Sequence, residues 1–268
     1  MDRVKEARME GQSVKQCCAA FYGSDVARLL LGDSFHPGGI KLTQRMGTLL
    51  GLTPESRVLD VASGRGTSAL CLAESFGCHV TGVDLSEENV RLATEEANRR
   101  GLAHWIGFHR GDAERLPFCD NTFDALVCEC AFCTFPSKQI AASEFYRVLR
   151  PGGLLGLSDL TRTEEAIPDL EGLLAWIACI GDALPTGRYS EILASAGFEL
   201  TTVEDHRAAL VVMVREIQGK LFGAEVAVAL KKLDLPGVDF FAAKKFAQSA
   251  LQVTQSGNLG YAVMISRK

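Results

Sequence analysis

The stretch Val58-Leu59-Asp60-Val61-Ala62-Ser63-Gly64-Arg65-Gly66 decides how the rest of the 268-residue sequence is interpreted. Residues 58–61 form an apolar run broken by one acid, which is typical of the end of a buried strand. The glycines predict a sharp turn, and residues 67–76 continue with helical spacing. A glycine turn between a strand and a helix is typical of nucleotide sites, because glycines let a ligand approach the backbone and the helix start offers free N–H groups.

A second acid supports this interpretation. Asp84 ends the next apolar run, residues 80–83, and lies 24 residues after Asp60. An acid at the tip of the second strand can accept hydrogen bonds from both hydroxyls of a ribose, as in dinucleotide-binding folds.

Further motifs follow in order along the chain. They are Asp60-x-x-x-Gly64-x-Gly66, Asp84, Gly111-Asp112-Ala113-Glu114-x-Leu116-Pro117-Phe118, Phe123-Asp124 and Arg147-Val148-Leu149-Arg150-Pro151-Gly152-Gly153. With these motifs, over roughly residues 45–160, the sequence resembles the class I S-adenosylmethionine-dependent methyltransferases. Ala62-Ser63 departs from the Gly-Cys or Gly-Ser that this family often has, so we expect a slightly bulkier turn.

The resemblance implies S-adenosylmethionine as the cofactor and a set of residues that bind it. Asp84 is expected to hold the ribose hydroxyls, and Asp112 with Ala113 to contact the adenine. Gly64 and Gly66 are expected to let the cofactor approach the backbone. The complete set of expected cofactor-binding residues is Tyr22, Asp60, Ala62, Ser63, Gly64, Gly66, Asp84, Leu85, Asp112, Ala113 and Glu129.

From residue 57 the sequence alternates strand and helix patterns, which predicts an α/β fold with a parallel sheet and right-handed crossovers. The resemblance adds a Rossmann-like class I methyltransferase sheet that ends in an antiparallel C-terminal strand pair. Expected strands are 57–61, 79–84, 105–110, 123–129, 154–159, 198–206 and 259–266. Expected helices are 1–20, 24–31, 40–50, 67–76, 87–100, 139–149, 170–181, 186–196, 208–221, 224–233 and 240–255.

These elements suggest four parts of the chain. They are an N-terminal helical lid segment (1–44), an S-adenosylmethionine-binding Rossmann-like domain (45–206), a helical cap insertion (207–258) and the final strand of the sheet (259–268). A surface through which two copies form a homodimer is the alternative to a cap. By resemblance Tyr22 and His36 are lid residues that close over the cofactor, although His36 could instead cap the helix that follows it.

The composition of the chain limits the classes of binding partner that we expect. The net charge is −5 and no long Lys/Arg run occurs, so a small-molecule acceptor is expected and nucleic acid is not. Apolar runs such as residues 208–214 are too short to span a membrane, and residues 1–16 have no apolar signal core. A cytoplasmic location is therefore expected, with the 9 cysteines as reduced thiols.

The run Cys128-Glu129-Cys130-Ala131-Phe132-Cys133 is the most unusual local feature, because it ends a strand beside the expected methyl group. Thiolates bind soft, thiophilic ions. Here the sequence resembles, more loosely, the arsenite methyltransferases, whose strand-four cysteine falls on Cys130 and whose later cysteine falls on Cys179. Their third cysteine follows a Tyr-Gly pair, where this chain has Ser24. The resemblance implies that Cys130 and Cys179 hold a trivalent metalloid, arsenite or methylarsenite, for methylation.

Other interpretations stay open at this point. Free cysteines are often small buried hydrophobes, and we interpret Cys71, Cys78 and Cys119 in this way and expect Cys128 in the core. An ordinary small-molecule methyltransferase would act on carbon, oxygen or nitrogen and use Glu129, His36 or His206 as a base. A zinc module at Cys128, Cys130 and Cys133 lacks the second pair of ligands that structural zinc sites usually have.

Overall fold

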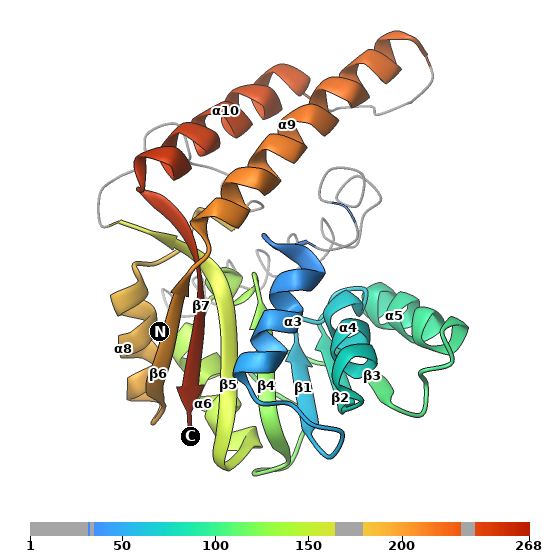
Figure 1. The fold of residues 1–268 in the computed structure, drawn as a ribbon, viewed down its shortest axis with the longest axis vertical. Coiled ribbons are helices and arrows are strands. Elements are labelled where there is room, and N and C mark those ends of the chain that lie inside the picture. The colour runs from blue at the N-terminus through green and yellow to red at the C-terminus, as the bar shows by residue number, and fades with distance from the viewer. Residues whose placement is uncertain (1–31, 33–34, 164–178, 232–238) are drawn as a thin grey trace, which may run out of the picture.

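The computed structural model describes residues 32, 35–163, 179–231 and 239–268 (Figure 1). The expectations for Tyr22 and for the helices before residue 31 lie outside these residues, as does most of the helix expected at 170–181. Among the helices that the structure does describe, none combines the length and the apolar character that a membrane crossing requires.

A seven-stranded sheet in the order β3-β2-β1-β4-β5-β7-β6 forms the centre of the molecule. β7 runs antiparallel to its neighbours β5 and β6, while the strands from β3 to β5 pair in parallel. This confirms the expected parallel sheet with an antiparallel C-terminal pair. The strands are β1 (Arg57–Val61), β2 (His79–Asp84), β3 (Ile106–Arg110), β4 (Phe123–Glu129), β5 (Leu149–Arg162), β6 (Glu199–Asp205) and β7 (Leu259–Arg267).

Helices cover both faces of the sheet. One apolar core joins the sheet to α3, α4, α5 and the near ends of α9 and α10, and the other joins it to α6 and α8. The short 3₁₀ helix η1 follows β4 directly. The helices are α3 (Gly39–Leu49), α4 (Thr67–Phe76), α5 (Glu87–Arg99), η1 (Phe132–Thr134), α6 (Lys138–Val148), α8 (Thr186–Ser195), α9 (Arg207–Ala229) and α10 (Phe240–Ser256).

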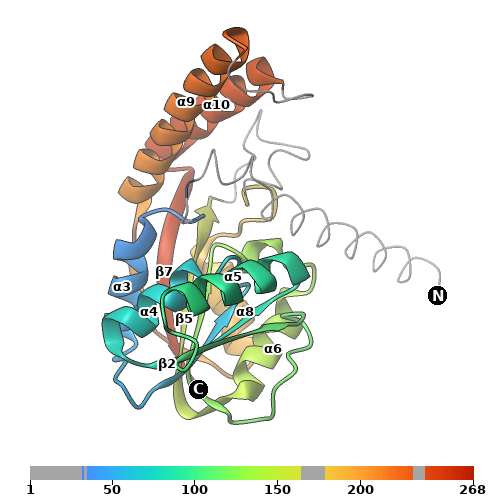
Figure 2. The same ribbon diagram turned by 90° about the vertical axis from the view of Figure 1, so that its right-hand side faces the viewer.

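The helical insertion differs from its prediction. Instead of separate helices at 208–221 and 224–233, one continuous helix α9 runs through Gly223. A glycine inside a helix costs only about 1 kcal/mol relative to alanine, and the buried residues Leu221 and Ala224 on either side favour continuity. α9 and α10 lie side by side and project beyond the sheet (Figures 1 and 2).

Two other expectations are corrected. β5 is longer than the expected 154–159, because its end pairs with β7 as far as Arg162 opposite Leu259. Cys179 was expected on a helix but lies in a turn with a positive φ of 61°. The division of the chain into lid, core domain, cap and final strand stays a prediction.

Candidate active site

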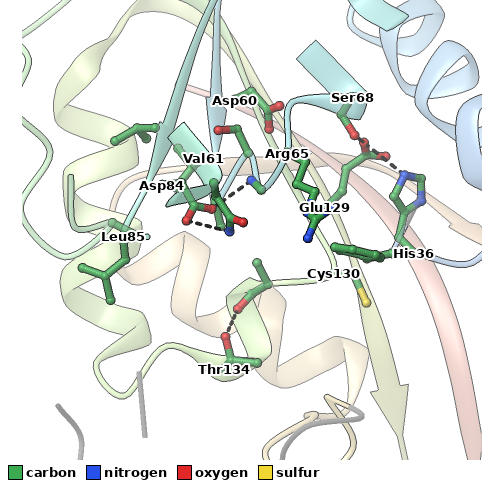
Figure 3. Close-up of a pocket in the computed structure, with 18 of the residues that line it drawn as sticks. His36, Asp60, Val61, Arg65, Ser68, Asp84, Leu85, Glu129, Cys130 and Thr134 are labelled. Carbon is green, nitrogen blue, oxygen red and sulfur yellow. Dashed lines mark hydrogen bonds and ion pairs between the residues drawn. The ribbon is translucent and has the colours of Figure 1, made fainter. Parts of the chain in front are cut away.

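A cavity of about 160 Å³ opens at the carboxyl ends of β1, β2 and β4. β1 and β4 are neighbours from which the chain winds outward in opposite directions, and ligands of open α/β sheets bind at such a switch point. Most of the site residues expected from the sequence line this cavity (Figure 3). They are Asp60, Ala62, Ser63, Gly64, Asp84, Leu85, Asp112, Ala113, Glu129 and Cys130.

The two glycines of the turn after β1 serve different purposes. Gly64 has a positive φ of 53°, and a Cβ atom built on it would meet nothing within 4 Å, so it borders open space in the cavity. Gly66 does not line the cavity; a Cβ there would come within 2.6 Å of the Phe108 ring. The structure thus gives Gly66 a packing role under Phe108, while its expected part in letting a cofactor approach the backbone stays a prediction.

Asp84 ties the glycine turn to the end of β2. Its Oδ2 accepts a hydrogen bond from Gly64 N at 2.8 Å, and its Oδ1 accepts from Ser86 N at 2.8 Å and from Asn89 Nδ2 at 3.2 Å. Burial raises the pKa of this carboxyl, and these hydrogen bonds oppose the shift. The loop is thus held in shape before any ligand binds.

Asp60 and Glu129 bring two further carboxyl groups to the same cavity. Asp60 is 2 % exposed, and burial, then the charges of Glu129 and Asp84, raise its pKa well above the usual range. Asp60 Oδ2 and Glu129 Oε1 are buried without a hydrogen-bond partner. Buried acceptors normally have a donor, so these two atoms favour a ligand that carries positive charge and N–H groups.

Side chains from two helices and one loop hold Glu129 in place. Its Oε2 accepts hydrogen bonds from Thr43 Oγ1 at 2.9 Å and Ser68 Oγ at 2.5 Å, and His36 Nε2 lies 3.5 Å away. His36 also lines the cavity and contacts Thr43 Oγ1 at 3.2 Å. The N-cap residue of α3 is Gly38 and no side chain caps this helix, so the side chain of His36 does not serve as the cap that we considered.

The opposite end of the cavity is formed by the loop after β3. Asp112 Oδ1 accepts a hydrogen bond from Glu114 N at 3.0 Å, and Asp112 and Arg115 form a small antiparallel bridge. Ala113 and Leu85 add apolar surface there. This end suits a flat, largely apolar group with polar edges.

The structure brings Cys130 and Cys179 together, as expected. Cys179 Sγ lies 3.5 Å from the carbonyl oxygen of Cys130, and a hydrogen bond between the two thiols, followed by burial, raises the pKa of Cys130. Burial and a hydrogen bond with Cys179 raise the pKa of Cys133 as well. Both Cys130 and Cys179 have a positive φ, of 52° and 61°. Only Cys130 of these three lines the cavity.

The other cysteines that the structure describes divide between core and surface. Cys71, Cys78 and Cys128 are buried, which confirms their assignment, whereas Cys119 is exposed and its assignment as a buried residue was wrong. Within the described residues, no three His, Cys, Asp or Glu side chains are arranged to hold a metal ion, so the zinc module finds no support there. His206 does not line the cavity; its Nε2 contacts Glu204 Oε2 at 3.1 Å.

Sequence reasoning missed several residues of the site. Arg65 stands between the two glycines and lines the cavity, yet the motif treats its position as variable. Thr43 and Ser68 contact Glu129 across 86 and 61 residues of sequence, so no local pattern pointed to them. Thr134 and Phe135, which also line the cavity, follow directly from the cysteine-rich run that the sequence did single out.

Comparison with known proteins identifies the central part of the chain. Residues 59–157 match the model of a methyltransferase domain. A sterol 24-C-methyltransferase from Eremothecium gossypii is 30% identical over 187 residues, which cover 67% of this chain and 50% of that protein. A phosphoethanolamine N-methyltransferase from Triticum aestivum is 33% identical over 169 residues, which cover 63% of this chain and 33% of that protein. The matched region thus spans half or less of the curated relatives.

Solved structures extend the likeness to the whole fold. The crystal structure of the [4+2]-cyclase SpnF superposes with a TM-score of 0.75 and 24% identity, covering 95% of both chains. At that identity the likeness establishes the fold alone. Because this neighbour is named a cyclase, the fold does not by itself assign methyl transfer.

Proposed function

Because the chain carries a methyltransferase domain of the class I type, whose cofactor is S-adenosylmethionine, we propose that it transfers a methyl group to a small organic acceptor. The observation that carries this proposal is the group of buried carboxyl groups of Asp60, Asp84 and Glu129 around one cavity. The relatives are named for methylation of a sterol carbon and of the nitrogen of phosphoethanolamine, so the acceptor class stays broad.

The residues around the cavity fit this cofactor. When bound, S-adenosylmethionine supplies a methyl group on a positively charged sulfur. Asp60 Oδ2 and Glu129 Oε1, both without a partner, would accept hydrogen bonds from its ammonium group. Arg65, at the same end of the turn, would face its carboxylate. Asp84 would hold the ribose hydroxyls, and Asp112 with Ala113 would contact the adenine.

The acceptor would enter beside Glu129 and Cys130, where His36 also lies (Figure 3). Methyl transfer is an in-line displacement, so the protein mainly has to align the acceptor atom and exclude water. An oxygen or nitrogen acceptor also has to lose a proton, and the imidazole of His36 lines the cavity without a part in binding the cofactor. We infer that His36 accepts this proton at Nδ1, which lies 3.2 Å from the carbonyl oxygen of Pro37, while Thr43 and Glu129 hold Nε2 and so orient the ring.

A turnover assay tests this function. The purified protein would be supplied with labelled S-adenosylmethionine and a panel of sterols, ethanolamine phosphates, glycine derivatives, arsenite and methylarsenite. With an oxygen or nitrogen acceptor, His36→Gln should lower kcat by about 100-fold, because a general base typically contributes that much or more, and leave cofactor affinity unchanged. His206→Gln is the matched control, since His206 lies outside the cavity. A cofactor that does not bind would refute the proposal.

The thiols support a second acceptor class, a trivalent metalloid, by one observation: Cys130 lines the cavity and contacts Cys179. The raised pKa of Cys130 counts against it, because metalloids bind thiolates. In the same panel, metalloid turnover that is lost in both Cys130→Ser and Cys179→Ser, and kept in the exposed Cys119→Ser, would establish this class. Full activity of both variants would leave the thiols as core packing.

A further inference from the structure

A second cavity, of about 270 Å³, lies at the antiparallel end of the sheet. The ends of β5 and β6 and the beginning of β7 form its floor, and the first residues of α8 and α9 and the end of α10 border it. Figure 1 shows the end of β6 leading into α9, with the beginning of β7 and the end of β5 to one side of it. No residue that lines this cavity also lines the first one, so the two are separate sites.

The lining of the second cavity is rich in hydrogen-bond donors. Two arginines, Arg162 and Arg207, face one acid, Asp205. Three threonines also line the cavity; they are Thr161, Thr163 and Thr186. Thr186 is also the first residue of α8, whose start has no side-chain cap and contributes positive potential. The balance of charge in the cavity is therefore positive.

Of the two arginines, Arg207 already has partners. Its Nη2 donates to Asp205 Oδ2 at 3.2 Å, and its Nη1 lies against Gly257 at the end of α10, where helix carbonyls favour a cation. Asp205 is further occupied by the backbone N–H of Arg207, at 2.8 Å. Arg207 thus holds the rim of the cavity together, and its charge is largely balanced.

Arg162 is different. Its Nε is buried without a hydrogen-bond partner, and no acid in the described part of the chain forms an ion pair with it. The hydroxyl of its neighbour Thr163 is also buried without a partner. Unpaired buried donors are costly, and a guanidinium pairs best with the oxygens of a carboxylate or phosphate. We propose that the second cavity binds an oxyanion, a carboxylate or a phosphate group, with Arg162 as its main ligand.

The distance between the two cavities limits what can occupy both. Ser158 O, on β5, accepts a hydrogen bond from Cys130 N at 2.7 Å, beside the first cavity. Arg162 lies four residues further along the same strand, which is roughly 13 Å at the usual rise per residue. An acceptor that reached from the methyl group to Arg162 would therefore be an extended molecule with an anionic end. A smaller oxyanion would occupy the second cavity alone.

Inorganic phosphate is the probe for this site. Calorimetric titration at constant ionic strength should show phosphate binding to the wild-type protein, and Arg162→Met should weaken it by about tenfold or more, as loss of a charge-assisted hydrogen bond does. Arg188→Met is the matched control, because Arg188 is an exposed arginine of α8 that pairs with Glu191. Equal affinity in Arg162→Met, or no phosphate binding by the wild type at millimolar concentration, would overturn the proposal.

Cofactor binding provides an independent check that each variant is folded, because it uses the first cavity. If the Arg162→Met protein does not bind the cofactor, Thr163→Val takes its place in the phosphate titration. This substitution removes the unpaired hydroxyl and keeps the shape of the side chain. Phosphate that raises the KM of an acceptor without affecting cofactor affinity would identify the oxyanion as part of that acceptor. Phosphate that binds without changing the KM would identify a separate small anion. The calorimetric titration with phosphate does not depend on the assignment of methyl transfer, whereas the KM comparison rests on it.

Discussion

Asp60 is the residue whose ionisation the cofactor should control. Burial, then the charges of Glu129 and Asp84, raise its pKa well above the usual range, so the free protein keeps its proton at pH values where an exposed aspartate is ionised. A bound cation favours the ionised form and lowers this pKa. Binding should therefore release up to about one proton at pH values between the two pKa values, and affinity should rise with pH across that window.

Calorimetry of S-adenosylmethionine binding in two buffers with different ionisation enthalpies measures this proton directly. Asp60→Asn should abolish the release, because an amide does not titrate, and should flatten the pH dependence of the affinity. Identical proton release in the wild type and in Asp60→Asn would show that another group titrates and would contradict the role of Asp60.

Individual site residues could be predicted where they end a strand or sit in a local motif. Asp60 and Asp84 were found in this way, because each follows an apolar run and precedes turn residues. His36 was found only as one of several candidates, since its contact with Glu129 depends on packing between α3 and β4. The positive φ of Cys179 could not be anticipated, because cysteine has no preference for that conformation.

The turn between β1 and α4 offers a test of what its glycines do. Gly64→Ala would place a methyl group in the open cavity and should weaken cofactor binding by about tenfold, since the ligand needs that space. Gly66→Ala would press a methyl group against Phe108 and should lower the free energy of unfolding by about 2–4 kcal/mol, the sum of overpacking and backbone strain. Chemical denaturation and calorimetry separate the two effects.

Gly51→Ala is the control for backbone strain in this pair. Gly51 has a positive φ of 61° and a Cβ there would meet nothing within 4 Å, far from the cavity lining. The Gly51→Ala substitution should lower the free energy of unfolding by about 1 kcal/mol and leave cofactor binding unchanged. If Gly64→Ala behaved as this control does, Gly64 would not border the bound cofactor.

Elements that depend on local sequence were predicted closely, and those that depend on distant partners were not. β1, β2 and β4 have the bounds expected from their apolar runs and turns. β5 extends to Arg162 because it pairs with Leu259, which lies almost a hundred residues further along the chain. Burial on both sides of Gly223 makes α9 continuous, although the local sequence favours a break there.

Within the described residues, the hairpin of α9 and α10 joins the apolar core through its end near the sheet. Near the sheet, Leu210, Val214 and Ala250 belong to the same apolar core as α3 and α4. Further out, Phe222 and Phe241 are 64% and 78% exposed. Val226, one turn after Phe222 on α9, and Leu230, the C-cap residue of this helix, are exposed as well. A contiguous exposed apolar surface often marks a binding site, so the far end could cover an acceptor or contact a second copy of the chain.

Substitutions along this hairpin distinguish its two ends. Leu210→Ala should lower the free energy of unfolding by about 2–4 kcal/mol, because it leaves a cavity in the core. Phe222→Ser should change the free energy of unfolding by less than about 0.5 kcal/mol in a monomer, because little buried surface is lost.

If two copies pair through the far end, thermal stability of the wild type should rise with protein concentration, and Phe222→Ser should remove that dependence. A concentration-independent wild type whose acceptor KM rises in Phe222→Ser would instead support a cap over the acceptor, while a large loss of monomer stability would contradict the exposed position of Phe222.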